Sequence, residues 1–527
     1  MLFVLSDQER GWSQYPSGFI EKHAPARQWL RENGVHFTDF QTPNALCSPA
    51  RGIIASGAQS PVNGMWDNAP IIYSTPLRTD RPTVGTLFQD AGYTTGYAGK
   101  WHLSHFEDET GSTPEQRRQI NRTIKSYGFD ETDNGEETDG PLTGWQHDDR
   151  TVERAIGFIR RRQSDERPWF LSVNLLNPHD IMYYTSGPEM TATRVSQFPD
   201  ASARPPFEDP LYAEDLGYEL TENFGPSTYE GRASGVQEYH LTFSEAMGHF
   251  DYEDRDAGRE MQNYYWNCTR DSDRHLKRLL DALETSGMMD DTIVVFTSDH
   301  GEILGSHGIR GKGTGVFREQ NHVPAIIVHP DGAKGAEISY PLSHIDWVPT
   351  LLGLAGVPGP VLREQMPMIV GRDFSRLVFE PGAPSPRADT GVLLLWSSIA
   401  FQRHQSVRKF DAVRKQSMPG RLFAMRELVK ENLTARGQMR AIYDGRWKFA
   451  RYGSPIVMDP ARNPTDLFAN YDLELFDTAA DPAEIRNLAR DPAFEGQIAS
   501  LNQRLNDLVA REIGDDDASF LPFYMRA

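Results

Sequence analysis

Short, mainly apolar runs recur along the chain and predict buried strands. The clearest occupy residues 2–6 (L-F-V-L-S), 169–176 (W-F-L-S-V-N-L-L) and 292–298 (T-I-V-V-F-T-S). Runs of this kind are typical of parallel strands that are covered on both faces, so helices are expected between them. Apolar residues spaced three and four apart predict such helices over residues 84–91 and 258–286. We therefore predict an α/β fold with a large mixed, mostly parallel sheet flanked by helices.

The C-terminal part of the chain has a different pattern. Proline and glycine crowd together over residues 357–386, which indicates a linker. Beyond it, G-V-L-L-L-W and A-I-Y-D-G-R-W-K-F-A-R-Y predict strands of a smaller sheet, and apolar spacing over residues 498–509 predicts a closing helix. We expect a main domain over residues 1–380 with an insertion at about 182–247, a connecting segment over 381–436, and a small C-terminal α+β subdomain over 437–527.

Two segments lack the pattern of regular structure. Residues 107–140 are charged and dotted with glycine, which indicates a surface excursion rather than part of the sheet. Residues 182–247 show little periodicity and many proline, tyrosine, glycine and glutamate residues. Long insertions in compact enzymes are usually lids or binding walls, so we expect this one to cover a site and to select its ligand.

Composition narrows the classes of partner. The 54 Lys and Arg residues against 74 Asp and Glu give a net charge of −20, which argues against nucleic acid as a partner. Two cysteines exclude a disulfide framework. The sequence has no 18-residue apolar run and no leader-like start, so we expect no membrane partner and a cytoplasmic location. A homo-oligomer is compatible with these features.

One stretch combines a cysteine, a proline and an arginine at short spacing. Cys47, Pro49 and Arg51 lie in T-P-N-A-L-C-S-P-A-R-G-I-I-A-S-G, whose small apolar residues predict a buried helix. If that helix begins near Ser48, position 47 lies at its positive end, which favours a thiolate or another anionic group. The plain alternative is an inert buried thiol, which is the usual state of a lone cysteine and the one we expect for Cys268.

Acidic residues follow two of the predicted strands. Asp7 comes after residues 2–6 and Asp299 after residues 292–298, and each is followed by a further polar residue, Gln8 or His300. The carboxyl ends of strands in an open α/β sheet open onto one crevice, where such side chains can share a hard divalent cation. A single Asp after a strand would otherwise be a turn or cap residue.

Basic residues follow other predicted strands. Lys100 and His102 come after the strand Y-T-T-G-Y-A, and their spacing of two projects both to one side, where they can reach one anion. His179 follows residues 169–176. The glycine-rich loop 305–315 carries Lys312, with Arg310 as a competing candidate, and precedes a predicted strand over 323–328. Taken singly, each would more often be a solvated, capping or packing residue.

The separate blocks together resemble the type I sulfatases of the alkaline phosphatase superfamily. The resemblance rests on C-S-P-A-R, on the G-Y-x-T-x-x-x-G-K-x-H pattern ending in Lys100 and His102, on S-D-H-G-E, and on E-L-F-D near the C-terminus. The blocks keep the family's order over nearly the whole chain. The resemblance implies an alkaline-phosphatase-like fold, a sulfate ester as the small-molecule substrate, and hydrolysis to an alcohol and inorganic sulfate.

The resemblance also implies a set of cofactors and residue roles. Cys47 would be oxidised to formylglycine by a formylglycine-generating enzyme, and one divalent cation would lie among Asp7, Gln8, residue 47, Asp299 and His300. Lys100, His179 and Lys312 would hold the sulfate, His179 or Lys312 would protonate the leaving oxygen, His102 would accept a proton from residue 47, and Arg51 would orient that residue.

Two departures from the family pattern leave alternatives open. Gln8 stands where a second acid is usual, and His300 where many sulfatases have Asn. The resemblance makes Ca²⁺ our first choice of ion, whereas the imidazole of His300 and the neutral amide of Gln8 leave Mn²⁺ or Mg²⁺ as alternatives. The same departures fit a phosphonate monoester or phosphodiester hydrolase. A binding protein that keeps the fold and the metal without the chemistry is a further alternative, which an unmodified thiol at position 47 would favour.

Overall fold

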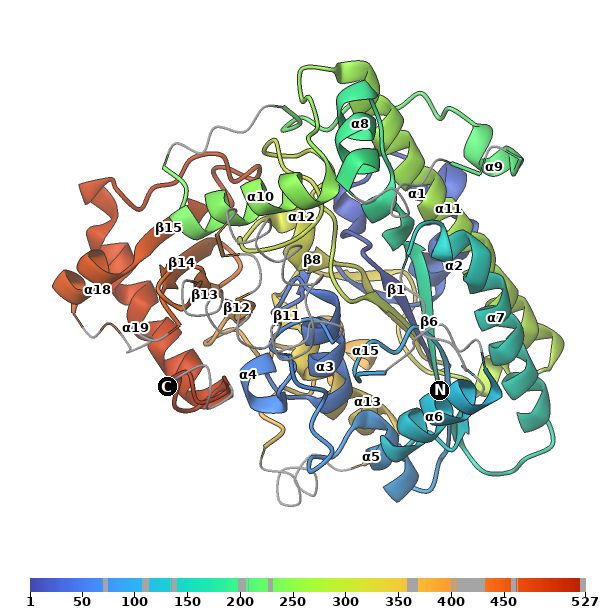
Figure 1. Ribbon diagram of the computed structural model, residues 1–527. Helices are drawn as coiled ribbons and strands as arrows, with labels where there is room; N and C mark the ends of the chain where they lie inside the picture. Colours follow the sequence, from blue (N-terminus) through green and yellow to red (C-terminus); the bar gives the residue numbers. More distant parts are fainter. Residues whose placement is uncertain are drawn as a thin grey trace.

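The computed structural model describes residues 1–521 except 70–73, 107–112, 133, 135–139, 198–204, 207, 226–230, 358–367, 400–401, 404–431, 456–460 and 462. Its described part contains a large sheet flanked by helices and a smaller sheet near the C-terminus (Figure 1). No helix in these residues is long and apolar enough to cross a membrane.

The large sheet has eight strands in the order β10-β2-β9-β7-β1-β6-β4-β5. Their bounds are β1 Leu2–Asp7, β2 Val35–Phe37, β4 Thr94–Gly99, β5 Glu131–Thr132, β6 Trp169–Pro178, β7 Val294–Ser298, β9 Ala325–Val328 and β10 Ala336–Ile338. Strand β1 pairs in parallel with both β6 and β7, whereas β9 runs antiparallel to its neighbours β7 and β2. The predicted mixed, mostly parallel sheet is confirmed.

The two faces of β1 bury different cores. Leu2 and Val4 pack with residues of α2 (Pro25–Asn33), α7 (Thr143–Arg162) and α11 (Arg255–Thr285). Phe3 and Leu5 point the other way and pack with residues of α3 (Cys47–Ser56), α5 (Val84–Asp90), α6 (Pro114–Ser126) and α13 (Trp347–Leu354). Successive side chains of a strand alternate between faces, so an all-apolar strand needs helices on both sides. Figure 1 shows β1 inside these helices.

The second sheet is antiparallel and has four strands, β12 (Val392–Trp396), β13 (Gln438–Tyr443), β14 (Trp447–Gly453) and β15 (Asp472–Asp477). Helix α19 (Glu495–Glu512) packs against one face of it through Ile498, Leu501 and Leu505. The predicted smaller sheet and closing helix are therefore present. Strand β12 is the strand predicted from G-V-L-L-L-W, and it lies within the segment 381–436 that the predicted domain bounds give as connecting.

Shorter elements complete the described chain. A three-stranded sheet has the order β11-β3-β8, formed by Leu342–Ser343, Phe40–Gln41 and His322–Val323. The remaining helices include α1 Phe19–His23, α4 Ser60–Asn63, α8 Pro188–Gln197, α9 Pro210–Ala213, α10 Ser234–Met247, α12 Arg318–Asn321, α15 Arg376–Phe379 and α18 Pro464–Asn470. Single 3-10 turns include η1 Trp12–Gln14, η2 His179–Tyr183, η4 Met289–Asp291, η5 His344–Asp346 and η6 Pro492–Phe494.

The structure departs from the sequence-based expectation at three places. Strand β5 lies inside residues 107–140 and pairs with β4, so this segment does contribute to the sheet. Helices α8, α9 and α10 occupy parts of the insertion 182–247. The strand predicted over 323–328 divides at Pro324 into β8 and β9, which belong to different sheets. Proline lacks the N–H that a continuous ladder would need there.

Candidate active site

Cys47 is the first residue of helix α3 and is only 2% exposed. Pro49 fits in the first turn because N–H groups there have no partner within the helix, and Gly57 ends the helix in a left-handed conformation (φ +63°). The hydroxyl of Ser48 donates to the main-chain oxygen of His102 at 2.6 Å, and the Ser48 N–H donates to Asn68 at 3.1 Å. The helix start is thereby tied to the loop after β4, and position 47 faces the site with the positive end of the helix behind it.

Arg51 connects two strand ends. Its Nη2 lies 2.9 Å from Oδ2 of Asp7, at the end of β1, and its Nε lies 2.9 Å from Oδ2 of Asp299, directly after β7. The remaining nitrogen, Nη1, donates to the main-chain oxygen of Lys100 (3.1 Å) and to Oδ1 of Asn174 (3.3 Å). All of these groups are buried. Because β1 and β7 are parallel neighbours, the two aspartates meet at one edge of the sheet and one guanidinium can hold both.

Four potential metal ligands, one of them Cys47, meet at the start of α3. Its Sγ atom lies 3.2 Å from Nε2 of His300, and this nitrogen lies 3.9 Å from Oδ1 of Asp7 and 3.8 Å from Oδ1 of Asp299. One ligand atom from each of these four buried residues falls within 4.8 Å of all the others. The residues therefore converge on a single point.

This donor set fits a divalent cation. Within the described part of the chain no donor hydrogen-bonds to Oδ1 of Asp7, although the atom is buried. A buried carboxylate oxygen is costly to leave unsatisfied, and a hard cation prefers such an oxygen as a ligand. The thiol of Cys47 occupies the place that an oxygen of a modified residue 47 would take.

Positive charge surrounds the thiol and the first aspartate. Nζ of Lys100 lies 2.8 Å from Oδ2 of Asp7, and both side chains are fully buried. Burial alone would raise the pKa of Cys47, but the charges of Lys312, Lys100 and His300 and a hydrogen bond with His102 outweigh it and bring that pKa well below its usual value. The pKa of Asp7 is lowered as well, since Lys100 leads the nearby charges that outweigh its desolvation. The site therefore favours an anionic group at position 47.

The predicted histidines also reach this region. His102 is 3% exposed and adopts a left-handed backbone (φ +55°), and its side chain hydrogen-bonds to that of Cys47. His179 begins η2 directly after β6, is fully buried, and is close enough to Asp7 for its charge to lower the pKa of that carboxyl. Both imidazoles are thus placed by the ends of neighbouring strands, β4 and β6.

Lys312 and Arg310 point to different parts of the molecule. Nζ of Lys312 donates to the side-chain oxygen of Gln8 and contacts the sulfur of Met182 at 3.8 Å. Arg310 instead contacts the sulfur of Met190 (2.8 Å) and the main-chain oxygen of Met247 (3.2 Å), both in the insertion. Of the two candidates in the glycine-rich loop, Lys312 lies at the site.

Gln8 lies between the cluster and this loop. Its N–H donates to Oδ1 of Asp299 at 3.0 Å, while its side-chain amide bonds to Lys312 and Glu302. Sequence reasoning did not single out Glu302, although the residue lies within the S-D-H-G-E block. It also missed Asn174, whose only signal was a polar residue in a mainly apolar strand.

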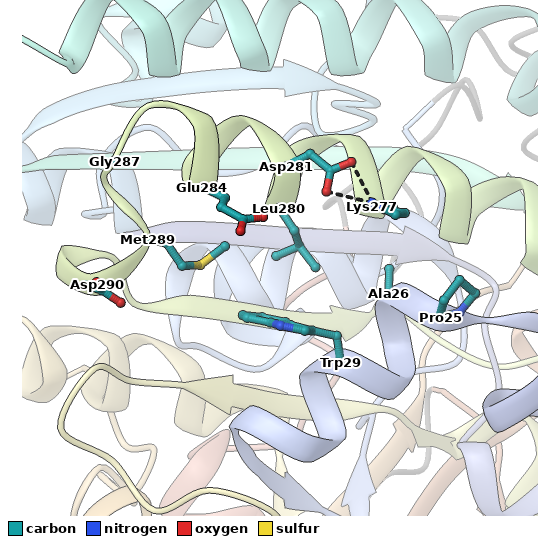
Figure 2. A pocket seen from close by; sticks show the side chains of 10 residues that line it. All are labelled: Pro25, Ala26, Trp29, Lys277, Leu280, Asp281, Glu284, Gly287, Met289 and Asp290. Atoms are coloured by element: carbon teal, nitrogen blue, oxygen red, sulfur yellow. Dashed lines mark hydrogen bonds and ion pairs between the residues drawn. The ribbon is translucent and has the colours of Figure 1, made fainter.

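A cavity in the described structure lies apart from these residues. This cavity of about 460 Å³ opens between α2 and the C-terminal end of α11 and is lined by groups such as Trp29, Leu280 and Asp281 (Figure 2). None of the residues of the cluster lines it. It adjoins η4, before the start of β7, whereas the cluster lies at the carboxyl end of that strand.

Comparisons with known proteins agree with this geometry. Residues 1–357 match the Sulfatase family model. A curated relative, the ulvan-active sulfatase of Formosa agariphila, is 25% identical over 528 residues, covering 98% of this chain and 82% of the relative.

Two solved structures are similar in fold. One, a 2-O GAG sulfatase, has a TM-score of 0.69 at 20% identity, covering 97% of this chain and 92% of that one. The other, a phosphonate monoester hydrolase from Silicibacter pomeroyi, has a TM-score of 0.63 at 19% identity, covering 98% and 96%. The family match over the first 357 residues, which include the whole cluster, leads to one conclusion: this chain belongs to the sulfatase family and is a sulfatase enzyme.

Proposed function

We propose that this sulfatase hydrolyses a sulfate monoester of an aryl, alkyl or sugar alcohol to the alcohol and inorganic sulfate, using a formylglycine made from Cys47 and one divalent cation. The observation that carries the proposal is the convergence of Cys47 with Asp7, Asp299 and His300 within 4.8 Å. In the living cell, a formylglycine-generating enzyme would act on the chain during its maturation.

When bound, the cation would act as a Lewis acid that offsets negative charge, and the hydrated aldehyde of residue 47 would supply the nucleophilic hydroxyl. Asp7, Asp299 and His300 would hold the ion, with Gln8 beside them. Ca²⁺ suits the carboxylate oxygens, and the imidazole of His300 keeps Mn²⁺ or Mg²⁺ as alternatives.

The chain's own residues divide the remaining work. Lys100 and Lys312 bring positive charge to the oxygens of the sulfate, where negative charge grows during the reaction. His102 would accept a proton from residue 47, a role supported by its hydrogen bond to the side chain of that residue. His179 or Lys312 would donate a proton to the leaving alcohol oxygen. Arg51 fixes the two aspartates and faces residue 47 from one helical turn away.

A phosphonate monoester or phosphodiester hydrolase is the second candidate. The neutral amide of Gln8 and the imidazole of His300 reduce the negative charge at the cation relative to a site built from acids alone. The fold of the phosphonate monoester hydrolase named above is compatible with this reading, although a likeness at 19% identity concerns the fold alone.

One experiment in two stages tests the proposal. Mass spectrometry of the peptide across Cys47, from protein made in its native host, should show the aldehyde in place of the thiol. The same sample should then turn over a sulfate monoester from a panel of aryl, alkyl, choline and sugar sulfates, faster than a phosphonate monoester or a phosphodiester. A sulfated sugar belongs in the panel because a relative is named as ulvan-active. An unmodified thiol, or a large preference for the phosphorus esters, would overturn the first choice.

A further inference from the structure

Glu302 has a buried carboxylate with which the described residues form no ion pair, since Arg10 donates to its main-chain oxygen instead. It is 2% exposed and follows Asp299 by three residues. Its Oε1 atom accepts the N–H groups of Leu304 (2.9 Å) and Gly311 (2.7 Å), and its Oε2 atom accepts a hydrogen bond from the side-chain amide of Gln8. Each of these donors is uncharged. Burying a carboxylate costs free energy when only uncharged donors satisfy it.

The carboxylate of Glu302 sets the direction of the Gln8 amide. A carboxylate can only accept hydrogen bonds, so it must face the NH₂ end of Gln8, which turns the carbonyl oxygen the opposite way. That oxygen accepts from Nζ of Lys312. The main chain of Gln8 is fixed too, because its N–H donates to Asp299 at 3.0 Å and its oxygen accepts from the hydroxyl of Tyr265 at 2.9 Å. The side chain cannot satisfy both neighbours if it is flipped.

Glu302 also fixes the backbone beside Lys312. Glu302 binds the N–H of Gly311, the residue directly before Lys312, and so fixes the backbone that carries the ammonium group. The ammonium group then meets the neutral oxygen of Gln8, and the described residues place no carboxylate in an ion pair with it. Its charge is left available for an anion.

We infer that Glu302 is a positioning residue for the anion-binding group of this site: it orients the amide of Gln8 and the backbone before Lys312, and thereby sets where Lys312 presents its charge to a sulfate group. The inference deepens the proposed function and rests on it for the identity of the anion. In the described residues, no hydrogen bond or ion pair joins Glu302 to residue 47.

Exchanging the two side chains tests this directly. In Glu302→Gln, the new NH₂ group faces the NH₂ of Gln8, so Gln8 must flip and present donors to Lys312. Gln8→Glu alone places two carboxylates face to face. The double variant Gln8→Glu/Glu302→Gln restores every hydrogen bond, and only the bond between positions 8 and 302 changes its direction, with the new amide at position 302 now donating to the new carboxylate at position 8. Glu474→Gln is the matched control, since Glu474 is equally buried and accepts from the Ala233 N–H (3.1 Å) and the Tyr452 hydroxyl (3.0 Å), away from Gln8.

Two measurements are needed, urea unfolding of the four variants and calorimetric titration of the folded proteins with sodium sulfate in the presence of Ca²⁺. Glu302→Gln should weaken sulfate binding by about tenfold or more, as loss of an outer-shell partner commonly does, whereas Glu474→Gln should not. The double variant should be more stable than the two single effects predict. Its sulfate affinity should stay low, because Lys312 then pairs with a carboxylate.

The inference fails if Glu302→Gln binds sulfate within about twofold of the wild type, or if the double variant shows no recovery beyond additivity. The unfolding data can refute the inference even where sulfate binding is too weak to measure, because the Gln8–Glu302 contact is its first step. Neither readout requires turnover. A wild-type protein that hydrolyses no sulfate ester but shows this pattern would refute the proposed function and leave the positioning role of Glu302 in place.

Discussion

The Sγ atom of Cys47 lies 3.2 Å from Nε2 of His300, although the two residues are 253 positions apart in the chain. One begins a helix and the other follows a central strand, so the contact depends on how α3 packs on the sheet. It brings the residue predicted to be modified into contact with a predicted ligand of the cation. The contact therefore joins the side chain at the start of α3 to a side chain that follows the carboxyl end of β7.

Replacing Cys47 with alanine should abolish turnover without unfolding the protein. The change removes the group from which the nucleophile would be made, so we expect a loss of sulfate ester hydrolysis of about a thousandfold or more, as is typical when a nucleophile is removed. The free energy of unfolding should fall by only about 2 kcal/mol because little side-chain volume is lost. Steady-state kinetics and urea unfolding measure the two effects.

Cys268→Ala is the control for this change, since Cys268 is also fully buried but lies in α11. It should lower stability by a similar amount and leave turnover nearly intact. Full activity in Cys47→Ala would contradict the proposed chemistry.

Replacing Arg51 with lysine should weaken both the fold and the cation site. A lysine keeps the charge but cannot bind Asp7 and Asp299 together, so we expect a loss of about 2 kcal/mol or more in the free energy of unfolding. Calcium affinity should fall as well, because the two carboxylates lose their common support. Urea unfolding and calcium titration by calorimetry provide the measurements.

Arg27→Lys is the matched control. Arg27 is fully buried and joins Glu9 (Nε to Oε1, 2.9 Å) and Asp273 (Nη1 to Oδ1, 3.0 Å) in the same manner, but it lies outside the cluster. It should destabilise the protein comparably without changing calcium affinity. Equal effects of the two variants on calcium binding would refute the assigned role of Arg51.

Removing divalent cations with a chelator should stop turnover but leave the protein folded. Arg51 and Lys100 already balance the charges of Asp7 and Asp299, so the carboxylates do not depend on an ion to coexist. Adding Ca²⁺ at about a hundred times its dissociation constant should restore activity and raise the free energy of unfolding by about 2.7 kcal/mol. Thermal unfolding followed by circular dichroism, with parallel assays, tests this, and activity that survives chelation would contradict it.

A buried histidine in the insertion should make stability depend on pH. His240 in α10 is 3% exposed, and burial, followed by the nearby charges of His307 and Arg232, lowers its pKa from 6.5 to about 3. The folded state therefore holds it neutral, while the unfolded state binds a proton below pH 6.5. The contribution of the neutral imidazole to the free energy of unfolding is therefore complete above pH 6.5 and is lost as the pH falls. The loss amounts to about 2 kcal/mol at about pH 5.

The variant His240→Phe should reduce the difference in unfolding free energy between neutral and acidic buffer by that amount, and the exposed His249→Phe should not. Urea titrations at the two pH values measure the differences. An unchanged pH dependence in His240→Phe would show that the imidazole is accessible to protons in the folded protein.

Much of the fold could be predicted because single segments carry their own signal. The apolar run of β7 and the spacing in α11 depend only on nearby residues, and both elements lie where the sequence places them. Helix α10 was missed, although Val236, Tyr239, His240 and Phe243 fall at helical spacing. Apart from Val236, its buried side chains are aromatic or polar rather than aliphatic, so the pattern did not appear as hydrophobic periodicity.

Local sequence specifies the kinds of groups at the site and their settings: a cysteine at the start of a helix, acids at the ends of strands, and basic residues in the loops that follow. The convergence of Asp7, Cys47, Asp299 and His300 on one point, and the facing of the Gln8 amide toward Lys312, come from the folded chain. Strand order and hydrogen-bond direction depend on packing between segments hundreds of residues apart, and no local pattern encodes that packing.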